Sequence, residues 1–148
     1  MIKATVAPEL PWILLADDSA NDCKVIQMAL KRLEIPCGLK TVGDGEALLS
    51  ALKGGDRPSF ILLDLNLPLK NGFEVLHELK SDPQLKAIPV IVWSTSENPA
   101  DILMSYQCGA SSFLTKLDSF ERIMEAMHAL TLYWLRTAKL PLVPTPRP

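Results

Sequence analysis

Cysteine and histidine are scarce in this chain, whose 148 residues include three cysteines and two histidines. Cys23, Cys37 and Cys108 are odd in number and form no CxxC pair, so neither a zinc site nor a redox dithiol is indicated, and we expect reduced thiols. No apolar run reaches the length of a membrane span, and the segment MIKATVAPELPW lacks the layout of a signal peptide. We therefore expect a cytoplasmic protein that makes no membrane contact.

A strong excess of charge of either sign is also lacking. Lysine and arginine together number 15 against 17 acidic residues, which gives a net charge of -2 and a pI near 5.7. A nucleic-acid partner is not expected, because phosphate-backbone binding needs a broad basic surface. Hydrophobic residues make up 48% of the chain and charged residues 22%, which indicates one folded domain with a substantial core.

Short apolar runs alternate with longer segments of helical periodicity, which is the pattern of βαβ units around a parallel sheet. This predicts a doubly wound α/β fold, because the chain is too short for a closed eight-stranded barrel. We expect an extension over residues 1–11, one domain over 12–136 and a proline-rich tail over 137–148. Strands are predicted at 12–16, 39–42, 60–64, 90–93 and 111–115. Helices are predicted at 20–33, from residue 45 onward, at 73–82, from residue 98 to near 109, and from about 118 to about 135. Asp44 is the predicted cap of the second helix, and Asp118 with Glu121 is the predicted capping box of the last.

Polar side chains capable of chemistry follow the predicted strands. Asp17 and Asp18 follow the first strand, Asp64 ends the third, Ser94 follows the fourth and Lys116 follows the fifth. In a doubly wound sheet these carboxyl ends form the ligand-binding edge. Three crowded carboxylates repel one another unless a cation joins them, and oxygen donors without histidine or cysteine suit Mg²⁺.

This arrangement suits phosphoryl transfer to a carboxylate, which can attack phosphorus to form an acyl phosphate. Lys116 and a hydroxyl would then stabilise the phosphoryl oxygens. Each residue taken alone has a simpler interpretation: Asp17 and Asp18 as helix caps, Ser94 as a turn residue and Lys116 as a solvated charge. Their joint occurrence at strand ends favours the chemical interpretation.

The stretch DLNLPLKNG, with its spacing of Asp, Pro and Gly, resembles the receiver domain of two-component response regulators over about residues 12–135. The resemblance implies a flavodoxin-like sheet of strand order 2-1-3-4-5 with a long last helix. It implies that Asp64 is the phosphoacceptor, and that Asp17 and Asp18 form the acidic pair, with Asp18 as the direct Mg²⁺ ligand. The backbone carbonyl of Asn66 would complete the metal ligands.

The same resemblance implies that Ser94 supplies the switch hydroxyl, that Lys116 is the lysine characteristic of receiver domains, and that Phe113 is the aromatic switch residue. Phe113 replaces the more frequent tyrosine and cannot donate a hydroxyl hydrogen bond. Leu117 stands where proline, often after a cis peptide bond, is usual. Thr95 stands where alanine is common, and it is expected to narrow access to the site.

The last helix, with LYWLRTAKLP, resembles that of stand-alone regulators paired with bacterial phytochrome kinases. Leu132, Tyr133 and Leu135 leave surplus apolar surface there, which indicates a partner or dimer face or a surface covered by the tail. The expected partners are a sensor histidine kinase and a second copy, the latter through the face formed by the fourth helix, fifth strand and last helix.

Three alternatives remain at this stage. A Mg²⁺-dependent aspartyl phosphohydrolase would be expected to contain the motif DxDx[TV]. Here Asn66 stands at the position of the second Asp of that motif. A flavodoxin-like cofactor binder would need a phosphate cradle after the first strand, where Asp17 and Asp18 repel phosphate. A phosphorylation-independent interaction module would not need every chemical position filled. The expectation is a signalling phosphoacceptor that is not an enzyme.

Overall fold

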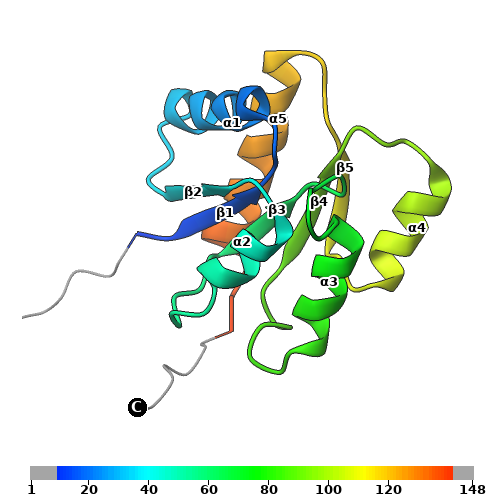
Figure 1. Ribbon diagram of the computed structural model, residues 1–148. Helices are drawn as coiled ribbons and strands as arrows, with labels where there is room; N and C mark the ends of the chain where they lie inside the picture. The colour runs from blue at the N-terminus through cyan, green and yellow to red at the C-terminus, as the bar shows by residue number, and fades with distance from the viewer. Residues whose placement is uncertain (1–9, 142–148) are drawn as a thin grey trace, which may run out of the picture.

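Five parallel strands form one sheet and, numbered along the chain, lie in the order 2-1-3-4-5, which confirms the predicted order and the doubly wound fold. The computed structural model describes residues 10–141 (Figure 1). The elements along the chain are β1 (Trp12–Ala16), α1 (Ala20–Arg32), β2 (Gly38–Val42), α2 (Gly45–Ala51), β3 (Phe60–Leu63), α3 (Gly72–Ser81), β4 (Val90–Ser94), α4 (Pro99–Gln107), β5 (Ser112–Thr115), α5 (Phe120–Thr131) and the π-helical turn η1 (Leu132–Thr137).

Side chains of the central strands alternate between two hydrophobic cores, one on each face of the sheet. In β1, Leu14 and Ala16 pack with α2 and α3, whereas Ile13 and Leu15 pack with α1 and α5. Figure 1 shows α1 and α5 on one side of the sheet and α2 and α3 on the other. Burial on both faces explains why these strands are continuous apolar runs, and it leaves their carboxyl ends as the place for polar side chains.

Side-chain caps set where the helices begin. Asp44 accepts a hydrogen bond from the backbone N–H of Ala47, and Asn98 accepts one from Ala100, as predicted for α2 and α4. The predicted Asp118 cap of α5 is wrong. The cap is Ser119, whose hydroxyl oxygen accepts from the N–H of Arg122, because it lies one residue closer to the helical N–H groups.

Several predicted ends differ from the structure by one or a few residues, and two of these differences concern the site and the last helix. Strand β3 ends at Leu63, so Asp64 is the first residue after the strand. The last helix was predicted to end near Leu135, whereas α-helical geometry ends at Thr131 and η1 continues to Thr137. Helical backbone thus passes the predicted domain end at residue 136. Most of the predicted tail, residues 142–148, lies outside the described residues, as do residues 1–9 of the predicted extension.

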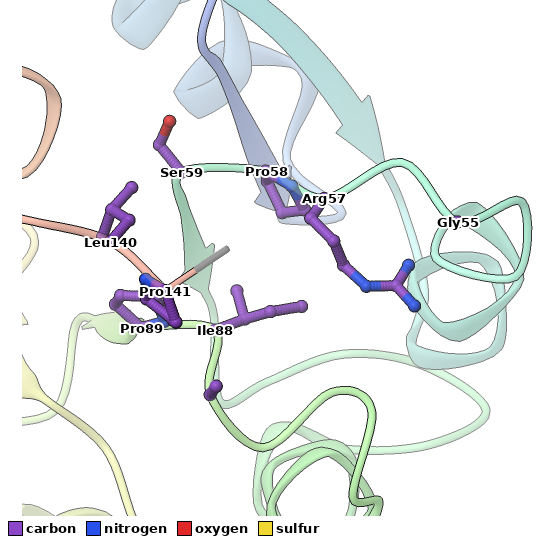
Figure 2. Close-up of a pocket in the computed structure, with 9 residues that line it drawn as sticks. Gly55, Arg57, Pro58, Ser59, Ile88, Pro89, Leu140 and Pro141 are labelled. Carbon is purple, nitrogen blue, oxygen red and sulfur yellow. The ribbon is translucent and has the colours of Figure 1, made fainter. Parts of the chain in front are cut away.

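A small pocket lies at the amino edge of the sheet, opposite to the ends where the polar side chains gather. Figure 2 shows Leu140 and Pro141 beside Ser59 and Pro89, with the side chain of Arg57 directed away from them. Among the described residues that line it there is no carboxylate, histidine or cysteine. Leu140 and Pro141, which follow η1, thus lie at this edge, and Tyr133 of η1 is 53% exposed.

Gly72, the first residue of α3, lies directly against the backbone of Asp64. Its N–H donates to the carbonyl oxygen of Leu65 at 3.0 Å, and a Cβ on Gly72 would lie 2.6 Å from the carbonyl oxygen of Asp64. The backbone atoms on both sides cannot both keep their places if a methyl group is added. This packing fixes the loop after β3 relative to α3.

We therefore expect Gly72→Ala to lower the free energy of unfolding by about 1–3 kcal/mol, the usual range for overpacking. Urea unfolding followed by circular dichroism measures it. Gly54→Ala is the control, because a Cβ there meets nothing within 4 Å. Equal stability of the two variants would contradict the packing described.

Candidate functional site

Four of the predicted site residues converge at the carboxyl edge of the sheet. Asp17 follows β1, Asp64 follows β3, Ser94 ends β4 and Lys116 follows β5. Asp17, Asp64 and Ser94 are buried, with exposed fractions of 3%, 4% and 0%. The parallel sheet thus brings together groups that are far apart in the sequence.

The Lys116 ammonium group joins the carboxylates. Its Nζ lies 2.7 Å from Asp17 Oδ2, 2.8 Å from Asp22 Oδ2 and 3.1 Å from Asp64 Oδ2. The side chain of Lys116 is only 10% exposed. A buried ammonium of this kind needs compensating charge, and the three carboxylates supply it. Lys116 is therefore a central residue of the site and not a solvated surface charge.

Asp22 is a site residue that the sequence reasoning missed. It lies in the first turn of α1, where its backbone N–H donates to the hydroxyl oxygen of the Ser19 cap at 3.2 Å. An acidic residue in the first turn is usually explained by the helix dipole. The sequence signal that could have identified Asp22 as a site residue is its position about one helical turn after Asp17 and Asp18.

Asp17, Asp18 and Asp64 form a candidate divalent-metal site. One carboxylate oxygen from each lies within 4.8 Å of the others, and Asp18 is exposed where the other two are buried. Asp17 Oδ2 is buried, and its one polar partner within residues 10–141 is the Lys116 ammonium, at 2.7 Å. An all-oxygen donor set with a free lone pair fits a hard divalent cation such as Mg²⁺ or Mn²⁺.

Asn66 and Asp17 make local hydrogen bonds that fix the carboxylates. The N–H of Asn66 donates to Asp64 Oδ1 at 3.1 Å, and the N–H of Ser19 donates to Asp17 Oδ1 at 2.9 Å. These bonds leave Oδ2 of each carboxylate directed at Lys116. The predicted role of the Asn66 carbonyl as a metal ligand stays a prediction.

Burial and charge shift the titration of the central groups. Burial raises the pKa of the Asp64 carboxyl, while the Asn66 hydrogen bond and the Lys116 charge lower it and the Asp17 charge raises it. For Lys116 burial acts to lower the pKa, but the hydrogen bonds and charges of Asp17, Asp22 and Asp64 raise it overall. Lys116 is therefore a permanent cation, and Asp64 is a more basic carboxylate than an ordinary one.

The predicted switch residues lie on neighbouring strands. The Ser94 hydroxyl oxygen accepts from the N–H of Ser96 at 3.1 Å, and the Ser94 carbonyl accepts from the N–H of Lys116 at 2.6 Å. Phe113 of β5 is partly buried, and its N–H donates to the hydroxyl of Tyr106 in α4 at 3.2 Å. Tyr106 was not anticipated and supplies, from another element, a hydroxyl that Phe113 lacks.

The departures noted in the sequence also have structural counterparts. The peptide bond between Lys116 and Leu117 is trans, since residues 10–141 contain no cis peptide bond. Leu117 instead packs against the core on the α1 and α5 side.

Thr95 is exposed, so its predicted effect on access to the site stays a prediction. No helix among the described residues is both long and apolar enough to cross a bilayer.

Several known proteins are similar to this chain in sequence and fold. The family model "Response regulator receiver domain" matches residues 13–128. Response regulator Rcp1 of Synechocystis sp. is 39% identical over 135 residues, which cover 87% of this chain and 92% of that protein. The phosphorylated cyanobacterial phytochrome response regulator RcpA matches with a TM-score of 0.84 and 40% identity, covering 90% of this chain and all of that one. The Mn²⁺-bound form of Rcp1 matches with a TM-score of 0.80 and 38% identity, over 89% and 99% of the two chains.

The raised pKa of Asp64 predicts that Asp64→Asn stabilises the metal-free protein at pH 7. A carboxyl whose pKa is higher in the folded state destabilises that state once the pH exceeds its ordinary pKa. The gain in the free energy of unfolding should shrink as the pH falls through the raised pKa of the folded state, and it should vanish below the ordinary carboxyl pKa, where both states are protonated. Urea unfolding at several pH values in EDTA measures it.

Asp56→Asn is the control for this series, because Asp56 is exposed and far from the site in the loop before β3. Its stability should follow that of the wild type at every pH. A loss of stability in Asp64→Asn at pH 7 would show that the pairing with Lys116 outweighs the burial of the carboxylate.

Proposed function

Since the chain belongs to the response regulator receiver domain family, we propose that Asp64 accepts a phosphoryl group from a phosphohistidine of a sensor kinase. The protein is a receiver-type response regulator of two-component systems, and we propose that its chemistry takes place at the carboxyl edge of the sheet. The observation that carries the proposal is the contact of Asp64 with Lys116 beside Asp17 and Asp18. The one-domain organisation over residues 12–136 and a cytoplasmic location are parts of the same proposal.

In the proposed reaction a carboxylate oxygen of Asp64 attacks phosphorus. The bond from phosphorus to the histidine nitrogen breaks, the nitrogen keeps the electron pair, and an acyl phosphate forms on Asp64. Lys116 is already 3.1 Å from Asp64 Oδ2, so its ammonium can contact the incoming phosphoryl oxygens without a large movement. Ser94, at the end of the neighbouring strand, is proposed to donate its hydroxyl to the same group.

We propose Mg²⁺ as the resident cation, held by Asp17, Asp18 and Asp64 with the backbone carbonyl of Asn66. The cation would neutralise charge on the phosphoryl oxygens and reduce the repulsion among the carboxylates. Oxygen donors alone, with neither histidine nor cysteine in the cluster, support a hard cation. Lys116 supplies a further positive charge that the protein itself provides.

The proposed signal passes from Ser94 and Phe113 to the face formed by α4, β5 and α5. Exposed apolar side chains on α4, with Leu103 58% exposed and Met104 48% exposed, support a contact surface there. A second copy of the chain is the proposed occupant of this face. The similarity to the cyanobacterial phytochrome regulators supports a phytochrome-type histidine kinase as the phosphoryl donor.

An aspartyl phosphohydrolase is not favoured. Asn66 stands at the position where the motif of those enzymes has its second Asp. The backbone N–H of Asn66 donates to Asp64 and orients its carboxylate. The proposal is accordingly a phosphoacceptor that catalyses its own phosphorylation and dephosphorylation.

Asp64→Asn should abolish phosphorylation by acetyl phosphate in the presence of Mg²⁺, because an amide cannot form the acyl phosphate. Intact-protein mass spectrometry measures the added phosphoryl group. Asp118→Asn, at an exposed residue after β5, should be labelled like the wild type. Labelling of the Asp64→Asn protein to the wild-type level would disprove the assignment.

Asp18→Asn should weaken Mg²⁺ binding by more than about tenfold, since even groups outside the direct ligands typically contribute that much. Asp22→Asn is the matched comparison, because Asp22 contacts Lys116 but is not in the carboxylate cluster. Isothermal titration calorimetry distinguishes the two. Equal losses in both variants would mean that overall charge, and not the cluster, determines affinity.

A further inference from the structure

Leu69, in the loop that begins at Asp64, combines a strained backbone with an exposed side chain. Its φ is +66°, in the left-handed region that glycine and asparagine tolerate and a bulky residue rarely adopts. The residue is 77% exposed, the highest value among the large hydrophobic residues described. Leu69 therefore gains little from packing within the chain that would offset the backbone strain.

The local hydrogen bond explains the strain. The N–H of Lys70 donates to the carbonyl oxygen of Pro68 at 2.7 Å, so Leu69 is the central residue of a γ-turn. With positive φ this is the rarer and more strained of the two γ-turns. The other non-glycine residue with positive φ, Glu34, directly follows the C-cap of α1, where left-handed backbone is usual. Leu69 has no such explanation.

Neighbouring elements hold this turn in place. Gly45 of α2 packs so closely that a Cβ on it would lie 2.3 Å from the carbonyl oxygen of Lys70. Asn71 caps α3 by accepting from the N–H of Glu74 at 3.0 Å, and Lys70 is ion-paired with Glu78 one turn further along α3. The backbone at Leu69 is thus imposed from outside, and its side chain is directed to solvent.

We propose that Leu69 is a docking contact for the protein that carries the phosphoryl donor histidine. This inference rests on the proposed function, because the occupant follows from the chemistry at Asp64. That carboxylate is 4% exposed, so a donor histidine can reach it only if its protein covers the surrounding loops. A rigid apolar side chain on one of these loops fits an apolar patch beside the donor histidine, and strain that packing does not offset is typical of functional positions.

Leu69→Gly and Leu69→Met separate the contact from the backbone. Glycine removes the side chain and relieves the strain, whereas methionine keeps an apolar side chain of similar size at the same φ. The probe is an autophosphorylated phytochrome-type histidine kinase already shown to phosphorylate the wild-type chain. The readouts are kcat/KM for phosphotransfer, the Kd for the unphosphorylated kinase, labelling by acetyl phosphate, and the thermal unfolding midpoint.

We expect Leu69→Gly to lose about tenfold in kcat/KM and in kinase affinity, as for the loss of a strong interface contact. Its labelling by acetyl phosphate should be unchanged and its unfolding midpoint equal to or above that of the wild type, while Leu69→Met should retain most of the transfer. Transfer to Leu69→Gly at the wild-type rate would overturn the proposal. A matching loss with acetyl phosphate would also overturn it, because Leu69 would then shape the site itself. Failure of acetyl phosphate to label the wild type at Asp64 would count against the proposed function alone, since the kinase Kd still reports the contact.

Discussion

The attraction between Lys116 and the carboxylates of Asp17, Asp22 and Asp64 is the interaction on which the site depends. Without a cation, carboxylates placed this close would repel one another and destabilise the fold. Lys116 balances part of that charge, and the open side of the cluster at Asp18 leaves room for a divalent ion. The proposed phosphoryl transfer would add more negative charge at the same place, so the groups that stabilise the resting site would also suit the product.

The sheet and its loops supply the precision that this chemistry needs. Two fully packed cores fix the strands, and each strand ends where its polar residue is required. Gly72 allows α3 to approach the backbone of Asp64, and Gly45 allows α2 to approach the following loop. These close contacts hold Asp64 at a buried position and impose the strained turn at Leu69. Rigidity at the site and exposure of a docking residue thus have a common structural origin.

Much of this could be predicted from the sequence because the signals are local. Continuous apolar runs predicted β1, β3 and β4, and weaker signals at 39–42 and 111–115 predicted the edge strands β2 and β5. The rule that parallel strands end at one edge brought Asp17, Asp64, Ser94 and Lys116 together. Asp22 was missed because its partner is Lys116, 94 positions away, and a first-turn acid has a simpler explanation. The conformation of Leu69 could not be predicted, because leucine gives no signal for positive φ and the constraint comes from Gly45 in another element.

The central claim is that the carboxylate of Asp64 is the nucleophile of a cation-dependent phosphoacceptor site. Mapping of the phosphoryl group tests it most directly: the wild-type chain is treated with acetyl phosphate and Mg²⁺, the acyl phosphate is trapped by borohydride reduction, and the modified peptide is sequenced by mass spectrometry. We expect modification at Asp64 and none when EDTA replaces Mg²⁺. Modification at Asp17 or Asp18, or equal modification in EDTA, would contradict it.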